Sequence, residues 1–297
     1  MKKYLNILLI IFFTIIEIFI LSKSNIVITT FNKALNICLY SLMPTMFLSI
    51  LISQILINLH FEKYIHKFII NFFKYIFNIN DSDVIIFLLS IISGYPNNSK
   101  MLINNNNLNN IIQYTNFVNP IFLIVTVGSI YLKNIKLAFI ILLSQYISNI
   151  IIGIMLRNKN KINKVIKNND NNNFLDIYYS SLKSTIFSLA VIFSNILFFS
   201  IINALVTNII NINPLVNSIL TGLIEFSNGI FLVSKLNIDI FYKGLIILCI
   251  IVFSSFSMHM QIKSINEKIK YIKFLSYRIF NVFISIIIYI ILFRIFL

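Results

Sequence analysis

Long apolar stretches alternate with short polar ones along the whole chain. A transmembrane helix needs about 20 consecutive residues that are mostly apolar. Stretches that meet or approach this length lie at 4–21, 34–59, 117–132, 137–156, 182–206, 240–262 and 277–297. The pattern predicts an all-α polytopic membrane protein with about seven to nine membrane segments.

Two further apolar stretches are interrupted. The stretch 84–96 is too short to cross a bilayer and ends in a Gly-Tyr-Pro break, and 215–233 carries Glu225 between two glycines. Polar groups at membrane depth are costly unless they line a cavity or meet a partner. Both stretches are therefore predicted to be broken or re-entrant helices.

Two segments near the N-terminus have other patterns. Residues 1–33 combine a basic start with an apolar core, but they lack a small-residue cleavage site and include Glu17. They predict a retained N-terminal transmembrane helix rather than a signal peptide. The segment 60–80 mixes Lys and His with aromatic residues at helical spacing, which predicts an interfacial amphipathic helix.

A polar linker at 157–176, rich in Asn and Lys, divides the chain into halves at 34–156 and 177–297. The two halves resemble each other weakly, since SLMPTMF at 41–47 matches SLKSTIF at 181–187 at four of seven positions. In each half an interrupted segment, a polar-broken span and a long closing helix follow. Paired interrupted segments are typical of a transporter binding site.

Loop charges predict how the halves are oriented. Basic loops at 60–67, 157–167 and 263–273 are expected on the same side of the membrane as the basic N-terminus. They can share that side only if 84–96 and 215–233 enter the membrane and return. The first half then begins outside and the second inside, so two inverted repeats are predicted.

The composition supports the membrane class. The chain is 58% hydrophobic and 11% charged, with a mean hydropathy of +0.90, so a soluble domain could not bury its apolar surface. The net charge of +15 comes largely from basic residues in loops, and no nucleic-acid partner is expected. Cys38 and Cys249 lie in apolar stretches and are predicted to pack there.

Enzyme signatures are missing from the sequence. His60 and His66 are six residues apart and do not form the H-E-x-x-H motif of zinc proteases. Asp81 and Asp83 are close, but the sequence places no third ligand beside them. We therefore predict a protein that is not an enzyme and that uses no metal and no cofactor.

Candidate substrate-binding residues gather at the breaks of the first half. They are Gly94, Tyr95, Pro96, Asn97, Asn98, Ser99, Lys100, Asn116, Asn119 and Pro120. A lysine near the membrane core favours an anionic solute, and the alternative is a loop lysine that reaches the headgroups. Asn116 and Asn119 flank Pro120, where they could bind a substrate or simply cap the following span.

The second half carries a matching set of candidates. They are Gly222, Glu225, Ser227, Asn228, Gly229, Ser254, Ser255, Ser257, His259 and Gln261. A carboxylate at membrane depth is protonated, paired or bound to a cation, so Glu225 is a candidate group for coupling to H⁺ or Na⁺. The alternative for Glu225 is a role in helix packing. His259 could relay protons or bind a carboxylate, or it could lie at the interface.

Four motifs resemble a known family. SGYPNNSK at 93–100 is similar to the S-G-Y-P-x-G-A-K signature of the YlbJ-type sporulation integral membrane proteins, also called SpoVV, which contain nucleoside-recognition Gate domains. FVNPIFLIVTVG at 117–128, GLIEFSNG at 222–229 and FSSFSMHMQ at 253–261 are similar to further motifs of this family in the same order. The resemblance covers residues 35–290.

The resemblance implies a membrane protein of endospore formers that is distantly similar to concentrative nucleoside transporters. Such a protein acts at the mother-cell-derived outer forespore membrane and helps to move dipicolinate toward the spore. The motif positions are Gly94, Tyr95, Pro96, Lys100, Asn119, Pro120, Gly222, Glu225, Gly229, Ser257, His259 and Gln261. Dipicolinate is a planar aromatic dianion, which suits Lys100 and the hydroxyl and amide groups of these motifs.

The sequence also departs from the family. Asn98-Ser99 stands in place of Gly-Ala, Ser254-Ser255 in place of Gly-Gly, and Leu48 in place of a proline. Loss of these glycines indicates altered selectivity or a diverged paralogue.

Three functions follow from this interpretation. The first is a secondary transporter of a small organic anion, with dipicolinate as the leading candidate and H⁺ or Na⁺ as the coupling ion. The second is a transporter of a nucleoside or another solute. The third is a non-transporting membrane scaffold of sporulation.

Overall fold

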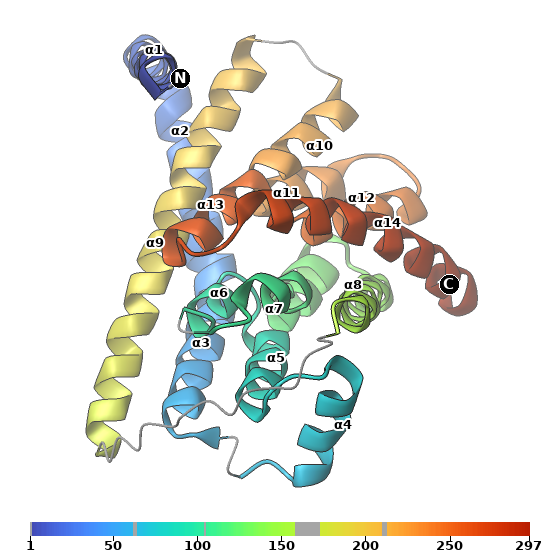
Figure 1. The fold of residues 1–297 in the computed structure, drawn as a ribbon. Helices are drawn as coiled ribbons and strands as arrows, with labels where there is room; N and C mark the ends of the chain where they lie inside the picture. Colours follow the sequence, from blue (N-terminus) through green and yellow to red (C-terminus); the bar gives the residue numbers. More distant parts are fainter. Residues whose placement is uncertain (1, 62–63, 104, 158–172, 210–212) are drawn as a thin grey trace.

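The computed structural model describes residues 2–61, 64–103, 105–157, 173–209 and 213–297. These residues form helices joined by turns, and no strand occurs among them. Figure 1 shows a long helix pair with a group of shorter helices beside it. The all-α class predicted from the sequence is confirmed for the described part of the chain.

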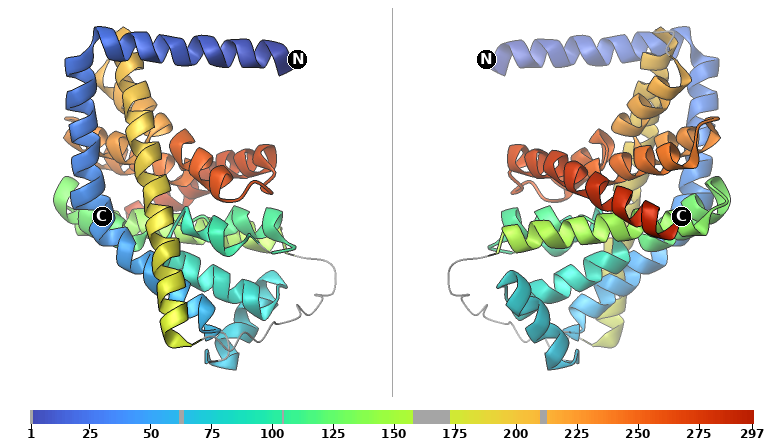
Figure 2. Two further views of the ribbon diagram at one scale, coloured as in Figure 1. Left: turned by 90° about the vertical axis from the view of Figure 1, so that its left-hand side faces the viewer. Right: turned by 90° about the vertical axis from the view of Figure 1, so that its right-hand side faces the viewer.

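The long pair is made by α2 (Ser24–Ile37), η1 (Cys38–Leu42) and α3 (Met43–Asn58), which continue one another, and by α9 (Phe174–Ile209). η1 is a π-helical turn, and Pro44 follows it in the first turn of α3. Proline cannot donate a backbone hydrogen bond, and a π-helical turn accommodates this loss without ending the helix. α9 packs along α2 and α3 and runs in the opposite direction (Figure 2).

Shorter helices from both halves pack beside this pair. The first half contributes α4 (Lys67–Phe77), α5 (Asp81–Ser93), α6 (Asn97–Met101), α7 (Leu108–Tyr114), the π-helix η3 (Phe122–Tyr131) and α8 (Ile135–Met155). The second half contributes α10 (Pro214–Ile224), α11 (Phe226–Lys235), α12 (Ile240–Phe253), α13 (Phe256–Ile265) and α14 (Tyr271–Phe296). Buried apolar side chains of α5, α7, α8 and α12, among them Phe87, Ile111, Ile141 and Ile251, form one continuous core.

The N-terminal helix ends earlier than the sequence predicts. α1 (Lys2–Ser22) meets α2 at a bend of 100°, contacts α9 and extends beyond it (Figure 2). The break falls at Lys23, whose backbone is not helical, because the apolar run gives way there to Ser, Lys, Ser and Asn. Residues 24–33 therefore belong to the long pair rather than to the N-terminal helix predicted at 1–33.

α4 is the amphipathic helix predicted within 60–80, and it covers only 67–77. It begins after His66, whose Nδ1 accepts a hydrogen bond from the backbone N–H of Phe68 at 3.2 Å. It ends at Asn78 in the left-handed conformation that commonly ends helices. The chain then bends by 96° into α5.

The faces of α14 are arranged as in a membrane protein. Its buried face carries Phe274, Arg278, Asn281, Ser285 and Tyr289. Its exposed face carries Ile279, Phe283, Ile287, Ile291 and Ile295. A helix on the surface of a soluble protein has the reverse pattern, with polar residues outward.

Among the described residues, four helical stretches are long and apolar enough to cross a membrane: α8, α9, α14 and the line of α12 and α13. The number rises to six if α1 with α2, and α4 with α5, each count as one bent span. α9 runs along the length of the molecule, whereas α8 and α14 run across it (Figures 1 and 2). The length and composition of these helices are compatible with a multi-pass membrane protein.

Candidate functional site

Four breaks between helices meet in the middle of the fold. They are residues 94–96 between α5 and α6, residues 115–121 between α7 and η3, Glu225 between α10 and α11, and Ser254–Ser255 between α12 and α13. We call these four segments together the junction. The breaks predicted at Gly94–Pro96 and at Glu225 are confirmed, and the junction brings motifs of both halves together.

The first two breaks pack against each other. The backbone N–H of Tyr95 donates to the carbonyl oxygen of Phe117 at 2.7 Å. Gly94 has a φ of +72°, and a Cβ atom there would lie 2.5 Å from the backbone nitrogen of Asn119. Only glycine fits both the conformation and the space, so the Gly-Tyr-Pro sequence is explained by this crossing.

Asn119 holds these breaks together. Its Nδ2 donates to Ser49 Oγ at 2.8 Å and to the carbonyl oxygen of Ser93 at 3.3 Å. Its Oδ1 accepts from the backbone N–H of Phe122 at 3.1 Å. The side chain of Asn119 is fully used by these protein partners, and Pro120 follows it at the start of the next helix. This arrangement matches the capping alternative for Asn119.

A side-chain hydrogen bond joins the second and fourth breaks, which come from different halves. Asn116 Nδ2 donates to Ser254 Oγ at 2.7 Å, and both residues are buried. Asn98 Nδ2 in turn donates to the carbonyl oxygen of Thr115 at 3.2 Å. The hydroxyl of Tyr95 reaches the carbonyl oxygen of Ile251 at 3.5 Å. Asn98 and Asn116, predicted separately as candidates, thus belong to one polar network.

Glu225 is fully buried and carries three hydrogen bonds. Its carboxylate accepts from the backbone N–H of Ser227 at 3.1 Å, from Ser227 Oγ at 2.7 Å and from the backbone N–H of Asn228 at 2.8 Å. The backbone at Glu225 is extended, so the side chain caps the start of α11. A negative charge is stabilised at a helix N-terminus, which explains how Glu225 can occupy this position.

The two glycines around Glu225 make α10 and α11 a tight hairpin. A Cβ atom on Gly229 would lie 2.1 Å from the Cα atom of Gly222. The backbones therefore touch where the helices diverge from the break. The helix break predicted within 215–233 is thus present, and the entry and return of this segment on one side of the membrane stays a prediction.

The fourth break holds two serines in unusual conformations. Ser254 has a φ of +68° and Ser255 a φ of +31°. Glycine adopts such values readily, whereas a side chain makes them costly. Ser255 Oγ accepts from the backbone N–H of Met258 at 3.4 Å and so caps α13.

His259 occupies an aromatic environment next to this break. Its Nε2 lies 2.8 Å from the carbonyl oxygen of Phe253, so this nitrogen carries the proton and donates. Its Nδ1 lies 3.4 Å from the hydroxyl of Tyr271. The rings of Phe253 and Phe274 lie 5.1 Å from the imidazole. His259 is buried here and is not at an exposed loop.

The remaining candidates on α6 and α13 lie beside the junction. Lys100 Nζ donates to the carbonyl oxygen of Ser184 at 2.6 Å and to Ser188 Oγ at 2.9 Å, both on α9. The ammonium group is therefore directed at the long helix α9. Ser99 Oγ donates to the carbonyl oxygen of Pro96 at 2.7 Å, and Gln261 Nε2 donates to Ser257 Oγ at 3.2 Å.

Some buried polar atoms around the junction have no protein partner among the described residues. They are Asn97 Nδ2, Asn98 Oδ1 and Gln261 Oε1. Buried polar atoms are normally hydrogen-bonded, and each exception needs a partner such as a water or a ligand. These atoms are therefore the ones that a polar solute could satisfy.

Sequence reasoning missed Arg278. This side chain is fully buried, one of its N–H groups bonds to the carbonyl oxygen of Gln113, and Nε and Nη1 have no partner among the described residues. Gln113 lies two residues before the second break, so this bond places Arg278 close to the junction. The signal was present in the sequence, because Arg278 is a charged residue inside the apolar stretch 277–297.

A polar seam between α8 and α14 was also missed. Asn281 Nδ2 donates to Asn149 Oδ1 at 2.6 Å, and Asn149 Nδ2 donates to the carbonyl oxygen of Asn116 at 3.3 Å. Gln145 Oε1 accepts from the backbone N–H of Val118 at 3.1 Å. The seam thus supports the second break from behind.

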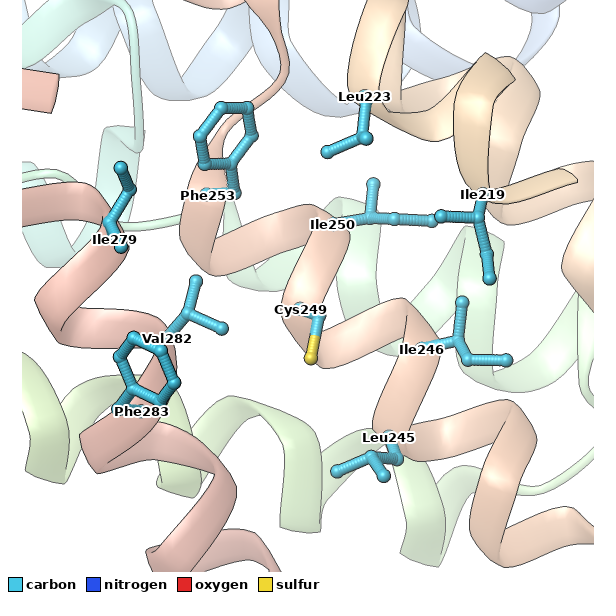
Figure 3. A pocket seen from close by; sticks show the side chains of 10 residues that line it. All are labelled: Ile219, Leu223, Leu245, Ile246, Cys249, Ile250, Phe253, Ile279, Val282 and Phe283. Atoms are coloured by element: carbon cyan, nitrogen blue, oxygen red, sulfur yellow. The ribbon is translucent and has the colours of Figure 1, made fainter. Parts of the chain in front are cut away.

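An apolar pocket of about 340 Å³ lies between α10, α12 and α14 (Figure 3). Side chains such as Ile250, Phe253 and Phe283 line it, and Cys249 is the most polar residue of its wall. It cannot provide hydrogen bonds to a polar solute, so it does not extend the junction. The location of Cys249 agrees with the packing role predicted for it.

Comparison of the chain with protein-family models, with curated proteins and with solved structures found no match in any of the three.

Proposed function

We propose that the protein is a secondary transporter of a small organic anion. The observation that carries this proposal is the meeting of four helix breaks around buried polar side chains from both halves, joined by the bond between Asn116 and Ser254. Broken helices whose ends meet inside a membrane protein are a common way to build a solute site. A scaffold has no need for buried polar groups at such a place, because they are costly there.

Dipicolinate is the solute we propose first, at the mother-cell-derived outer forespore membrane. The proposal rests on the resemblance of the four motifs to the YlbJ-type family. Two further observations support it. Ser254 and Ser255, which stand where that family has Gly-Gly, have the positive φ values that favour glycine. Arg278 and Lys100 add positive charge near the junction, which favours an anion, and Glu225 is the proposed group for coupling to H⁺ or Na⁺.

Two inverted repeats with about seven to nine membrane segments are part of the same proposal. In support, the line of α2 and α3 and the helix α9 run in opposite directions (Figure 2). α3 is followed by α4 and then α5, and α9 is followed by α10, so the two broken segments follow opposite ends of the long pair (Figure 1).

Single cysteines at positions 82 and 213 should therefore be labelled from opposite sides of the membrane. These positions lie at the starts of α5 and α10. The measurement uses a membrane-impermeant thiol reagent on cells and on inverted vesicles, in a background without Cys38 and Cys249. Labelling of both positions from one side would exclude the inverted arrangement.

The function is tested by the dipicolinate content of spores from a strain that lacks this gene. We expect the content to fall in the deletion strain and to return with the wild-type gene. Glu225→Gln and Lys100→Ala should not restore it, because they remove the buried carboxylate and the contact between α6 and α9. Lys243→Ala is the control, since Lys243 bonds only to the carbonyl oxygen of Ser234, away from the junction.

Protein levels must be equal in all strains for this comparison. A normal dipicolinate content in the deletion strain would mean that dipicolinate is not the transported solute. It would favour the alternative of a nucleoside or another solute. Full function of both point variants would favour the scaffold alternative.

A further inference from the structure

A polar pocket lies between α2, α9, α10 and α11. It has a volume of about 600 Å³, and its wall includes the side chains of Asn36, Asn203, Asn217 and Thr221. Eleven of the sixteen lining residues are polar, so the wall offers several groups that can bind a polar solute. None of its residues except Asn228 was a candidate in the sequence.

The charge of this pocket is positive. Lys33 from α2 and Lys235 from α11 line it, and no carboxylate is among its lining residues. The ammonium group of Lys235 lies 4.1 Å from the centre of the Phe231 ring. Among the described residues, an ion pair joins Lys74 to Asp81, and neither Lys33 nor Lys235 is paired with a carboxylate. A concave surface with two such cations attracts anions.

Neutral groups of the wall can complete the binding of an anion. Thr207 Oγ1 and Asn208 Nδ2 bond to carbonyl oxygens of their own helix, α9. Within the described residues, neither side chain bonds to another helix, and Asn217 Oδ1 is buried without a hydrogen-bond partner. A molecule with two carboxylates and a polar ring would meet two ammonium groups and several amides here.

The inner wall of the pocket is continuous with the third break. Asn228 lines the pocket, its backbone N–H donates to Glu225 Oε2 at 2.8 Å, and its Nδ2 donates to Ser200 Oγ at 2.7 Å. Thr221 also lines the pocket, and its carbonyl oxygen accepts from the backbone N–H of Glu225 at 2.7 Å. An anion in the pocket would thus be separated from Glu225 by the wall of the hairpin alone.

We propose that this pocket is a binding site for small organic dianions, in which Lys33 and Lys235 bind the carboxylates. Its place on the path of a transported anion rests on the proposed function. Binding itself can be measured without transport.

The test uses the full-length protein in lipid nanodiscs, with Cys38 and Cys249 replaced by alanine and Thr207→Cys added. Cysteine is close to threonine in size, and the Thr207 hydroxyl bonds only within α9, so the change is mild. The probe is pyridine-2,6-dicarboxylate, and the readout is the rate at which a thiol reagent modifies the cysteine. Ser180→Cys is the control, because Ser180 is on the same helix outside the pocket and also bonds within α9.

We expect the dianion to slow modification of Thr207→Cys and to leave Ser180→Cys unchanged. Lys33→Gln and Lys235→Gln should each raise the half-protecting concentration roughly tenfold, as for loss of one charged hydrogen bond. Lys243→Gln, outside the pocket, should not change it. Equal protection by picolinate, a monoanion, would argue against a site for dianions.

Three results would overturn the inference: no protection by the dianion, protection that survives both lysine variants, or a Thr207→Cys thiol that the reagent does not reach. Protection of the cysteine together with normal dipicolinate in the deletion strain would support the binding site and contradict the proposed transport of dipicolinate. Loss of dipicolinate from spores of the deletion strain, without protection of the cysteine, would support the transport and contradict the binding site.

Discussion

Gly229→Ala is expected to lower strongly the amount of folded protein in the membrane. The added Cβ atom would lie 2.1 Å from the Cα atom of Gly222 and 2.4 Å from its nitrogen. Both atoms belong to the backbone and cannot rotate away, so α10 and α11 would have to separate. Overpacking of this kind costs about 1–3 kcal/mol even where side chains can adjust, and backbone contact leaves less room to adjust. The measurement is the yield and thermal midpoint of detergent-extracted protein.

Ser234→Ala provides the matched control on the same helix. The hydroxyl of Ser234 bonds only to the carbonyl oxygen of Phe231 within α11, so its loss should change the thermal midpoint little. A thermal midpoint of Gly229→Ala equal to that of Ser234→Ala would contradict the close backbone contact between α10 and α11.

Arg278→Met is expected to abolish transport while it leaves the stability of the protein unchanged or higher. Arg278 is fully buried, and within the described residues only its Nη2 has a hydrogen-bond partner, the carbonyl oxygen of Gln113. Replacement of buried charges by apolar residues of similar size is often neutral or stabilising, because the cost of desolvation disappears. We expect a folded variant with an unchanged or higher thermal midpoint and spores without normal dipicolinate.

Arg294→Met is the control for this variant, since Arg294 is exposed near the end of the same helix. It should leave both the thermal midpoint and the dipicolinate content unchanged. Normal dipicolinate with Arg278→Met would mean that the buried charge has no part in transport. A large loss of stability would mean that the charge is balanced by a partner within the fold.

The breaks could be predicted because their signals are local. Gly94, Pro96 and Glu225 each interrupt an apolar run, and the structure places a helix end at every one of them. The bounds of α4 and of the N-terminal helix were predicted less accurately, because caps such as His66 decide where a helix begins. Local sequence says little about such boundaries.

The partners of the site residues could not be predicted, because they come from distant parts of the chain. Lys100 bonds to Ser184 and Ser188 on α9, and nothing near Lys100 in the sequence indicates this. The polar pocket likewise combines Lys33 with Lys235, which lie far apart along the chain. The threonines and asparagines between them carried little weight alone, because asparagine is common throughout this sequence.

The two serines of the fourth break restrict which substitutions can be tolerated there. Ser254 and Ser255 both have positive φ, where most side chains cost about 1–2 kcal/mol and glycine costs least. Ser254 also accepts the hydrogen bond from Asn116 that joins the halves, and glycine would lose it. Position 254 therefore sets two opposed requirements, one for a glycine-like backbone and one for a hydroxyl. A change there that satisfies the backbone removes the link, so positions 254 and 116 should be inherited as a pair.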